Sequence, residues 1–187
     1  MRELVLGGQK SGKSRWAEGR AAQWLAADAR HRAVLLATAQ PRDAEMRARI
    51  ERHRRERAAR VPGLETLEVA GAELPQAIQR QSSPQALVVV DCLTLWLTQL
   101  AWPPGRATAV EPEALEAPTQ ALEQALQAAS GPLVLVGNEI GLGITPLGAE
   151  VRAFVDALGT LNQRVAACCQ RVTLMVAGCP LTVKGAA

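Results

Sequence analysis

The sequence reads Gly7-Gly8-Gln9-Lys10-Ser11-Gly12-Lys13-Ser14 directly after the apolar run Leu4–Leu6. These eight residues match the pattern G-x-x-x-x-G-K-[ST] at every fixed position. The glycines let the backbone turn tightly, so that successive N–H groups point inward at phosphate oxygens. A helix-forming stretch follows, and its positive N-terminus adds to the attraction for phosphate. The segment therefore predicts a P-loop that binds a nucleoside triphosphate, in which Lys13 reaches the β- and γ-phosphates and Ser14 ligates Mg²⁺.

The rest of the chain continues this strand-then-helix pattern. The apolar runs are continuous rather than alternating, as is typical of strands buried on both faces. After Leu4–Leu6 they occur at Ala33–Ala37, Leu87–Val90, Leu133–Val136 and Val172–Val176. Helical patterns lie between them at Ser14–Ala27, Asp43–Arg60, Leu93–Leu100, Pro118–Ala129 and Ala149–Cys169. The alternation predicts an α/β fold of the P-loop NTPase type, with a mainly parallel sheet of at least five strands and helices on both faces. We expect residues 1–187 to form one domain.

Composition excludes several classes of protein. Aromatic residues make up only 3% of the 187 residues, which argues against a single-strand nucleic-acid binder that stacks bases. The net charge of +3 suits small phosphate-bearing ligands without requiring nucleic acid. No apolar stretch reaches about 18 residues, and the start resembles no signal peptide, so we expect a cytoplasmic protein without a membrane span. The four cysteines form no C-x-x-C pair, which favours reduced thiols over a zinc site. The proline-rich segment 102–118 predicts a surface loop or a lid.

Asp91 is a candidate ligand for the metal ion. It directly follows the apolar run Leu87–Val90, where the carboxyl end of a strand would meet the site. In P-loop enzymes an acid in this place holds Mg²⁺ beside the Ser or Thr of the loop. A second reading is a helix N-cap, because Leu93–Leu100 has a helical pattern, and the two roles are compatible.

The segment Asp43–Arg57 is the most unusual part of the sequence, because it is dense in arginine. On a helix, Arg49, His53 and Arg57 share one face, and neighbouring apolar residues predict that this face is half buried. We expect the imidazole of His53 to be neutral and nucleophilic at pH 7, since nearby cations disfavour another positive charge. Two other readings remain: a solvated basic helix with an incidental histidine, and a nucleic-acid patch. The interleaved glutamates dilute the positive field, so we expect no nucleic-acid partner.

Several motifs taken together resemble one family. Besides the P-loop, they are Ala37-Thr38-Ala39, Asp43-x-Glu45-Met46-x-x-Arg49-Ile50-x-x-His53-x-x-x-Arg57, Thr66-x-Glu68, Asp91-Cys92-Leu93-Thr94-Leu95-Trp96-Leu97-Thr98, Asn138-Glu139-Ile140-Gly141-x-Gly143-Ile144-x-Pro146 and Leu161-Asn162-Gln163-Arg164-Val165-Ala166. Over nearly its whole length the chain resembles the bifunctional adenosylcobinamide kinase / adenosylcobinamide-phosphate guanylyltransferase family of cobalamin biosynthesis. The chain departs from the family at Leu64, where a Trp often precedes the Thr-x-Glu motif.

This resemblance implies two reactions and a set of site residues. ATP or GTP would phosphorylate adenosylcobinamide, with Lys13 and Mg²⁺ supporting the transfer. His53 would then carry GMP from GTP to adenosylcobinamide phosphate through a guanylyl-histidine intermediate. The implied nucleotide-binding residues beyond the P-loop are Ala37, Thr38, Ala39, Arg54, Arg55, Glu56, Arg57, Glu68 and Asp91, with Glu68 accepting from guanine and with Ser14 and Asp91 at the metal. The family implies a homotrimer. A small P-loop kinase of another metabolite, with His53 a bystander, is the alternative.

Overall fold

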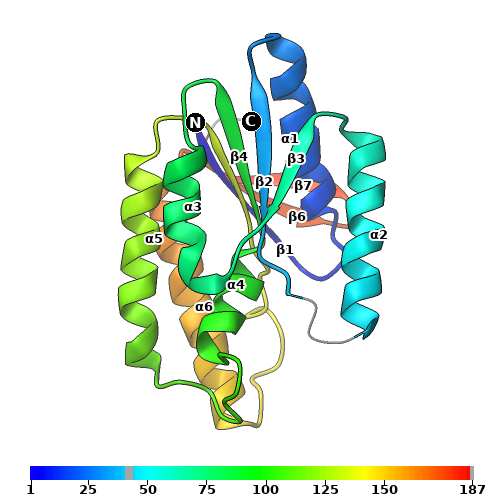
Figure 1. Ribbon diagram of the computed structural model, residues 1–187. Coiled ribbons are helices and arrows are strands. Elements are labelled where there is room, and N and C mark those ends of the chain that lie inside the picture. Colours follow the sequence, from blue (N-terminus) through cyan, green and yellow to red (C-terminus); the bar gives the residue numbers. More distant parts are fainter. Residues whose placement is uncertain (41–43, 186–187) are drawn as a thin grey trace.

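The computed structural model describes residues 1–40 and 44–185, apart from the side chains of Met46 and Arg49. Its strands form one seven-stranded sheet in the order β3-β2-β4-β5-β1-β6-β7 (Figure 1). The strands are β1 (Arg2–Gly7), β2 (Arg32–Ala37), β3 (Leu64–Glu68), β4 (Ala86–Asp91), β5 (Leu133–Val136), β6 (Arg171–Val176) and β7 (Cys179–Lys184). Only β7 runs antiparallel to its neighbour, β6. The predicted mainly parallel sheet of at least five strands is therefore confirmed.

Helices cover both faces of this sheet, as the sequence predicts (Figure 1). One face carries α1 (Lys13–Ala27) and α2 (Ala44–Arg60). The other carries α3 (Leu74–Gln81), α4 (Leu93–Ala101), α5 (Glu116–Ala128) and α6 (Ala149–Cys168). Two short 3-10 helices, Gly71–Glu73 and Pro112–Leu115, precede α3 and α5. Within the described part of the chain, no helix is both long enough and apolar enough to cross a membrane.

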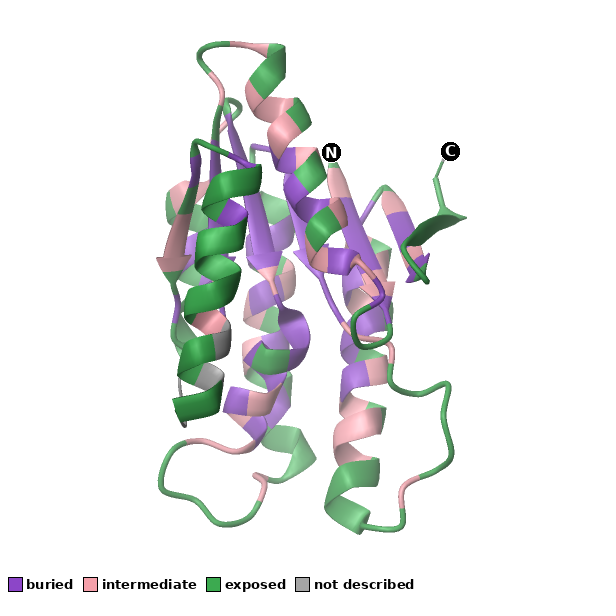
Figure 2. Cartoon of the chain, turned by 90° about the vertical axis from the view of Figure 1, so that its right-hand side faces the viewer, coloured by how far each residue is buried: buried purple, intermediate pink, exposed green. Residues whose placement is uncertain are grey.

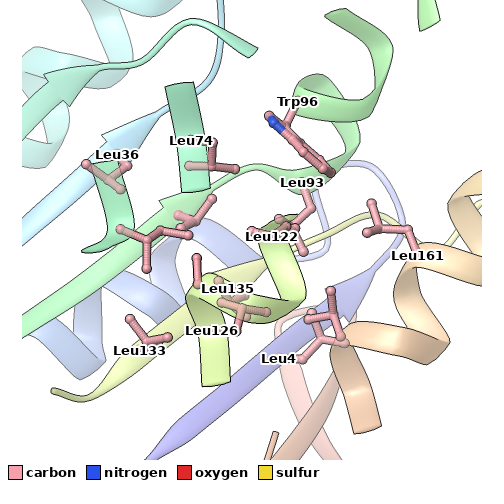
Figure 3. Close-up of a cluster of buried hydrophobic side chains, with 14 of the residues drawn as sticks. Leu4, Leu36, Leu74, Leu93, Trp96, Leu122, Leu126, Leu133, Leu135 and Leu161 are labelled. Carbon is pink, nitrogen blue, oxygen red and sulfur yellow. The ribbon is translucent and has the colours of Figure 1, made fainter. Parts of the chain in front are cut away.

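Alternation along the strands divides the core into two clusters. Leu4 and Leu135 point to the face covered by α3–α6, where Trp96 and Leu122 pack against them (Figure 3). The intervening residues, such as Val5, point to the face covered by α1. Because both sets are buried, the strands read as continuous apolar runs rather than as alternating ones. Figure 2 shows the consequence, a buried sheet between helices whose outer sides are exposed.

Two strands and one α-helix were not expected from the sequence. β3 reads Leu-Glu-Thr-Leu-Glu and is only partly buried, so it lacks the apolar run of the other strands. The residues of β7 are all exposed, and α3 is a short helix of eight residues with Pro75 in its first turn. The expected loop over 102–118 ends earlier than predicted, because Pro118 lies in the first turn of α5, where a missing N–H costs little. The predicted first residue of α2, Asp43, lies outside the described residues.

Candidate active site

The carboxyl ends of the parallel strands meet in one row across the sheet. Ala37 of β2 pairs with Glu68 of β3 on one side and with Asp91 of β4 on the other. Asp91 pairs in turn with Val136 of β5, and Val136 pairs with Val5 of β1, just before the phosphate loop. Open parallel sheets bind ligands beyond this edge. The residues that the strand pattern and the family resemblance indicate therefore lie along one edge of the sheet.

The loop between β1 and α1 depends on the two glycines of the P-loop pattern, Gly7 and Gly12. Gly7 has a φ of +150° and Gly12 a φ of +102°, which side chains rarely adopt. A Cβ on Gly7 would lie 2.5 Å from the carbonyl oxygen of Met175 and 2.6 Å from Ser11 Oγ. Gly12 caps the N-terminus of α1. The Gly178 N–H donates to the carbonyl of Ser11 at 3.0 Å, so the β6–β7 turn holds the loop from outside.

Polar groups inside this loop are close together. Gly8, Gln9 and Lys10 are exposed at its tip, whereas Ser11 and Lys13 are buried. Lys13 donates from Nζ to the carbonyl oxygen of Gly8 at 2.6 Å, and burial lowers the pKa of its ammonium group. The Ser11 hydroxyl is buried and has no hydrogen-bond partner among the described residues. The loop therefore directs a cation and a hydroxyl into the same small space, which suits phosphate oxygens.

The side chains of Ser14 and Asp91 lie close enough to interact. Burial raises the pKa of Asp91, and the interaction with the Ser14 side chain and the positive charge of Arg57 oppose that rise. A hydroxyl and a carboxylate at this edge supply the oxygen ligands that Mg²⁺ prefers. Phosphate oxygens and water generally complete the coordination shell of Mg²⁺. No group of three His, Cys, Asp or Glu side chains in residues 1–40 and 44–185 forms a separate metal cage. The donor set therefore fits a nucleotide-bound divalent cation.

Thr38 joins the ends of β2 and β4. Its Oγ1 donates to the carbonyl of Cys92 at 2.7 Å and accepts from the Cys92 N–H at 2.8 Å. Its own N–H donates to the carbonyl of Asp91 at 3.1 Å, and Gln99 donates to its carbonyl. The polar groups of Thr38 are thus used within the protein and fix the backbone that presents Asp91. Its neighbours Ala37 and Ala39 are only partly buried.

Helix α2 is attached through its C-terminal half. The buried Arg57 donates from Nε to Oε1 of Glu18 in α1 at 3.4 Å and from Nη1 to Thr66 Oγ1 at 3.3 Å. Arg60 donates to the other oxygen of Glu18 at 2.8 Å. His53, one turn earlier, is exposed. The prediction of a half-buried face is therefore wrong for His53, because α1 and β3 contact the helix one turn further on. The side chain of Arg49, the third predicted member of this face, is not described.

A cavity of about 520 Å³ lies between α2 and β3. Arg54 and Arg55, both implied by the family resemblance, line it together with Glu51, Ala58, Leu64 and Thr66. Arg54 Nη1 pairs with Glu68 Oε1 at 3.3 Å, and both side chains are more than half exposed. Glu56 instead pairs along the helix, with Arg52 and Arg60. The cavity therefore brings Arg55 close to the ion pair of Arg54 with Glu68, the carboxylate expected to accept from guanine.

Glu139 is a site residue to which the sequence reasoning gave no role. It follows β5, and its N–H donates to the carbonyl of Gly7 at 3.2 Å, so it adjoins the phosphate loop. Its Oε1 accepts from the Gly141 N–H at 2.9 Å, and the preceding Asn138 N–H donates to Thr94 Oγ1 at 2.8 Å. The partly buried carboxylate is therefore held in a defined place. The signal was present, because an acid soon after an apolar strand had already indicated Asp91.

Comparison with known proteins assigns this arrangement to a family. Residues 3–183 match the family model described as cobinamide kinase / cobinamide phosphate guanyltransferase. The chain is 42% identical over 185 residues to the bifunctional adenosylcobalamin biosynthesis protein CobP of Pseudomonas aeruginosa. That alignment covers 99% of this chain and 98% of the relative.

Two further relatives are similar over nearly their whole length. The proteins named bifunctional adenosylcobalamin biosynthesis protein CobU from Escherichia coli and Salmonella typhimurium are 35% and 34% identical to this chain. Each alignment covers 97% of this chain and 98% of the relative. The similarity therefore includes both the phosphate loop and the helix that carries His53.

Proposed function

Since the chain belongs to the cobinamide kinase / cobinamide phosphate guanyltransferase family, we propose that it performs both reactions of adenosylcobalamin biosynthesis at this one edge of the sheet. It phosphorylates adenosylcobinamide with ATP or GTP. It then transfers GMP from GTP to adenosylcobinamide phosphate, giving adenosylcobinamide-GDP and pyrophosphate. The observation that carries the proposal is the attachment of α2, with His53, to the helix that begins at the phosphate loop.

In the kinase reaction the substrate hydroxyl attacks the γ-phosphorus of the donor, and the nucleoside diphosphate leaves. Phosphoryl transfer needs mainly positioning and charge stabilisation. Lys13 is buried within the loop and exchanges its bond with the Gly8 carbonyl for the β- and γ-phosphate oxygens. Ser14 and Asp91 would hold Mg²⁺, which would supply neutralisation of the phosphate charge.

Glu139 accepts the proton of the attacking hydroxyl. Its carboxylate adjoins the phosphate loop, since its own N–H is bonded to Gly7, and Oε1 is held by the Gly141 N–H. A general base must lie within hydrogen-bond reach of the proton that it removes, and a partly buried carboxylate beside the γ-phosphate position meets that need. The substrate hydroxyl then lies between Glu139 and the phosphate.

In the transferase reaction, His53 is the nucleophile. One imidazole nitrogen attacks the α-phosphorus of GTP, a P–N bond forms, and pyrophosphate leaves. An oxygen of adenosylcobinamide phosphate then attacks the same phosphorus, the P–N bond breaks, and His53 is restored. Splitting one displacement into two is the usual gain of covalent catalysis. Arg54 and Arg55 offset charge on the triphosphate, and Glu68 accepts from the guanine N–H groups. Arg57 positions the helix, because its guanidinium is paired with Glu18.

Labelling with α-³²P GTP tests this proposal. We expect label that survives base and is lost in acid, as a phosphoramidate is, and no label in His53→Ala. The chain has one other histidine, His31, whose ring stacks on Trp24 at 3.7 Å, so His31→Gln is the matched control and should keep the label. Absence of covalent label in the wild-type protein would contradict the transferase mechanism. Phosphorylation of adenosylcobinamide is measured separately with γ-labelled ATP.

We also propose that the enzyme is a cytoplasmic homotrimer. The support is the family resemblance, the use of nucleoside triphosphates, and exposed apolar side chains that an assembly would bury. Leu142, Ile144 and Leu147 are 82%, 98% and 98% exposed. Light scattering on a gel-filtration column should give three times the chain mass of 19.9 kDa, and a monomer mass would contradict the proposal.

A further inference from the structure

A second cavity lies on the other side of the phosphate loop, between α1 and the β6–β7 turn. Its volume is about 330 Å³, and its lining includes Gly12, Arg15, Trp16, Gly19, Met175 and Gly178. Apart from Gly12, none of the lining residues belongs to the nucleotide-binding set that the family resemblance implies. The cavity begins at the loop itself, because Gly12 caps α1 and Gly178 donates to the Ser11 carbonyl.

The strand order indicates on which side of the triphosphate this cavity lies. β1 carries the loop, with β5 and β4 on one side and β6 and β7 on the other. Asp91 ends β4, so the proposed metal and the γ-phosphate lie on the β4 side of the loop. A triphosphate with its γ-phosphate toward Asp91 extends its nucleoside in the opposite direction, toward β6. The cavity beside Arg15 and Gly178 lies in that direction.

The wall of the cavity is rigid and its charges are balanced. Glu3 is completely buried, and its carboxylate accepts from Trp16 Nε1 at 3.0 Å, from Arg20 Nε at 2.8 Å and from Thr173 Oγ1 at 2.9 Å. The Arg20 guanidinium lies 4.9 Å from the centroid of the Trp16 ring. In contrast, Arg15 is exposed and makes no hydrogen bond or ion pair within the described part of the chain. A fixed aromatic wall and one available cation suit a base and an α-phosphate.

The two cavities differ in their acidic groups. No acidic residue is among the described residues that line the α1 cavity. A guanine-specific site needs an acceptor for the N1–H and N2–H groups, and a carboxylate is the usual choice. The cavity between α2 and β3 has Glu51 in its lining and Glu68 beside it. The α1 cavity therefore does not distinguish guanine from adenine by this means.

We propose that the α1 cavity holds the nucleoside of the phosphoryl donor in the kinase reaction, and accepts either purine, while the α2–β3 cavity holds the guanosine that is transferred. The inference rests on the proposed function. One phosphate loop then serves two nucleoside positions on its two sides. The triphosphate presents its γ-phosphorus when the base lies by α1, and its α-phosphorus to His53 when the base lies by α2.

The test fills the cavity at Gly19. A Cβ at Gly19 meets nothing within 4 Å, so Gly19→Phe places its ring in the cavity without a backbone clash. We expect the KM for ATP and for GTP in the kinase reaction to rise about tenfold, as for one lost base contact. The KM for GTP in guanylylation of pre-formed adenosylcobinamide phosphate should stay at the wild-type value. Gly159→Phe is the matched control, because Gly159 lies in α6 on the opposite face with equally open space.

Photolabelling of the wild-type protein with 8-azido-ATP gives a second readout. We expect crosslinks within residues 12–23 or 175–178, and crosslinks confined to α2 or β3 would overturn the proposal. Unchanged KM values in Gly19→Phe, or an equal rise in both reactions with a normal Gly159→Phe control, would also overturn it. If the wild-type protein phosphorylates no adenosylcobinamide, the proposed function fails, and the position of the crosslink still decides where the donor base binds.

Discussion

Arg57 of α2 donates from Nε to Oε1 of Glu18 in α1 at 3.4 Å, and the two side chains are only 8% and 4% exposed. Glu18 lies within the helix that starts at the phosphate loop, one turn beyond Ser14. Arg57 lies one turn beyond His53. This buried pair therefore connects the proposed nucleophile to the phosphate-binding element, although His53 itself is exposed.

We expect Glu18→Ala to lower the free energy of unfolding by about 3 kcal/mol, because it leaves the Arg57 guanidinium buried without its anion. Guanylylation should fall more than phosphorylation, since only guanylylation depends on where α2 lies. Urea denaturation followed by circular dichroism, together with both assays, measures these effects. Glu56→Ala is the control for stability, since Glu56 pairs with Arg60 at the exposed surface and should cost less than about 1 kcal/mol. Equal stability of the two variants would show that the Glu18–Arg57 pair does not stabilise the packing of α2 against α1.

Lys13→Met should lower kcat/KM of the kinase reaction by about 10³-fold, because the cation that meets the γ-phosphate is lost. Its stability should be equal to or greater than that of the wild type. Burial lowers the pKa of Lys13, which means that the folded protein disfavours the ammonium form, and Met fills a similar volume without a charge. Steady-state kinetics and thermal unfolding test the two parts. A variant that loses both activity and stability would indicate a structural role instead.

Glu139→Gln should reduce kcat of phosphorylation by about 10²-fold or more, with little change in KM. The amide oxygen still accepts from the Gly141 N–H, so the segment keeps its place, but it no longer takes a proton. Guanylylation of adenosylcobinamide phosphate supplies the internal comparison, since its attacking oxygen carries no such proton. Glu150→Gln, the same change in the first turn of α6, is the external control. Wild-type phosphorylation by Glu139→Gln would exclude it as the base.

The cysteines should differ sharply in reactivity. Burial, and to a smaller degree the neighbouring Cys168, raises the pKa of Cys169 to about 12, so almost no thiolate exists at pH 8. Its labelling should increase only as pH rises toward that value. Cys179 is exposed on β7. Iodoacetamide at pH 8, followed by peptide mass spectrometry, should therefore modify Cys179 and leave Cys169 intact in the native protein. Both should react in denaturant, and equal native labelling would contradict the burial of Cys169.

The sequence was sufficient for the elements that are buried on both faces. β5, with its four buried residues Leu133–Val136, is found where the apolar run predicts it, and α6 agrees within one residue. β3 and β7 were missed because each has a partly or fully exposed face, so no apolar run marks them. The pairing of Ala37 with Glu68 depends on β3, and it therefore became visible only in three dimensions.

The candidate site likewise contains residues that the sequence marks and residues that it does not mark. The phosphate loop and Asp91 could be found because local patterns mark them. Glu18 could not, because on a helix rich in Ala and Arg it reads as an ordinary surface residue. Its burial depends on Arg57 and Arg60, about forty positions away. The α1 cavity joins residues near 15 to residues near 178, and no local pattern relates them.

The place of β1 inside the sheet, between β5 and β6, has a consequence for the biosynthesis of the protein. β1 leaves the ribosome well before its partners β5 and β6, which begin only at Leu133 and Arg171. The turn that closes the phosphate loop, at Gly178, is made later still. Pairings between such distant segments form slowly, because the chain loses the entropy of closing a long loop before the new contacts stabilise it. A nascent chain therefore carries β1 unpaired until β5 and β6 have been made, so nucleotide binding arises only after the β6–β7 turn has left the ribosome.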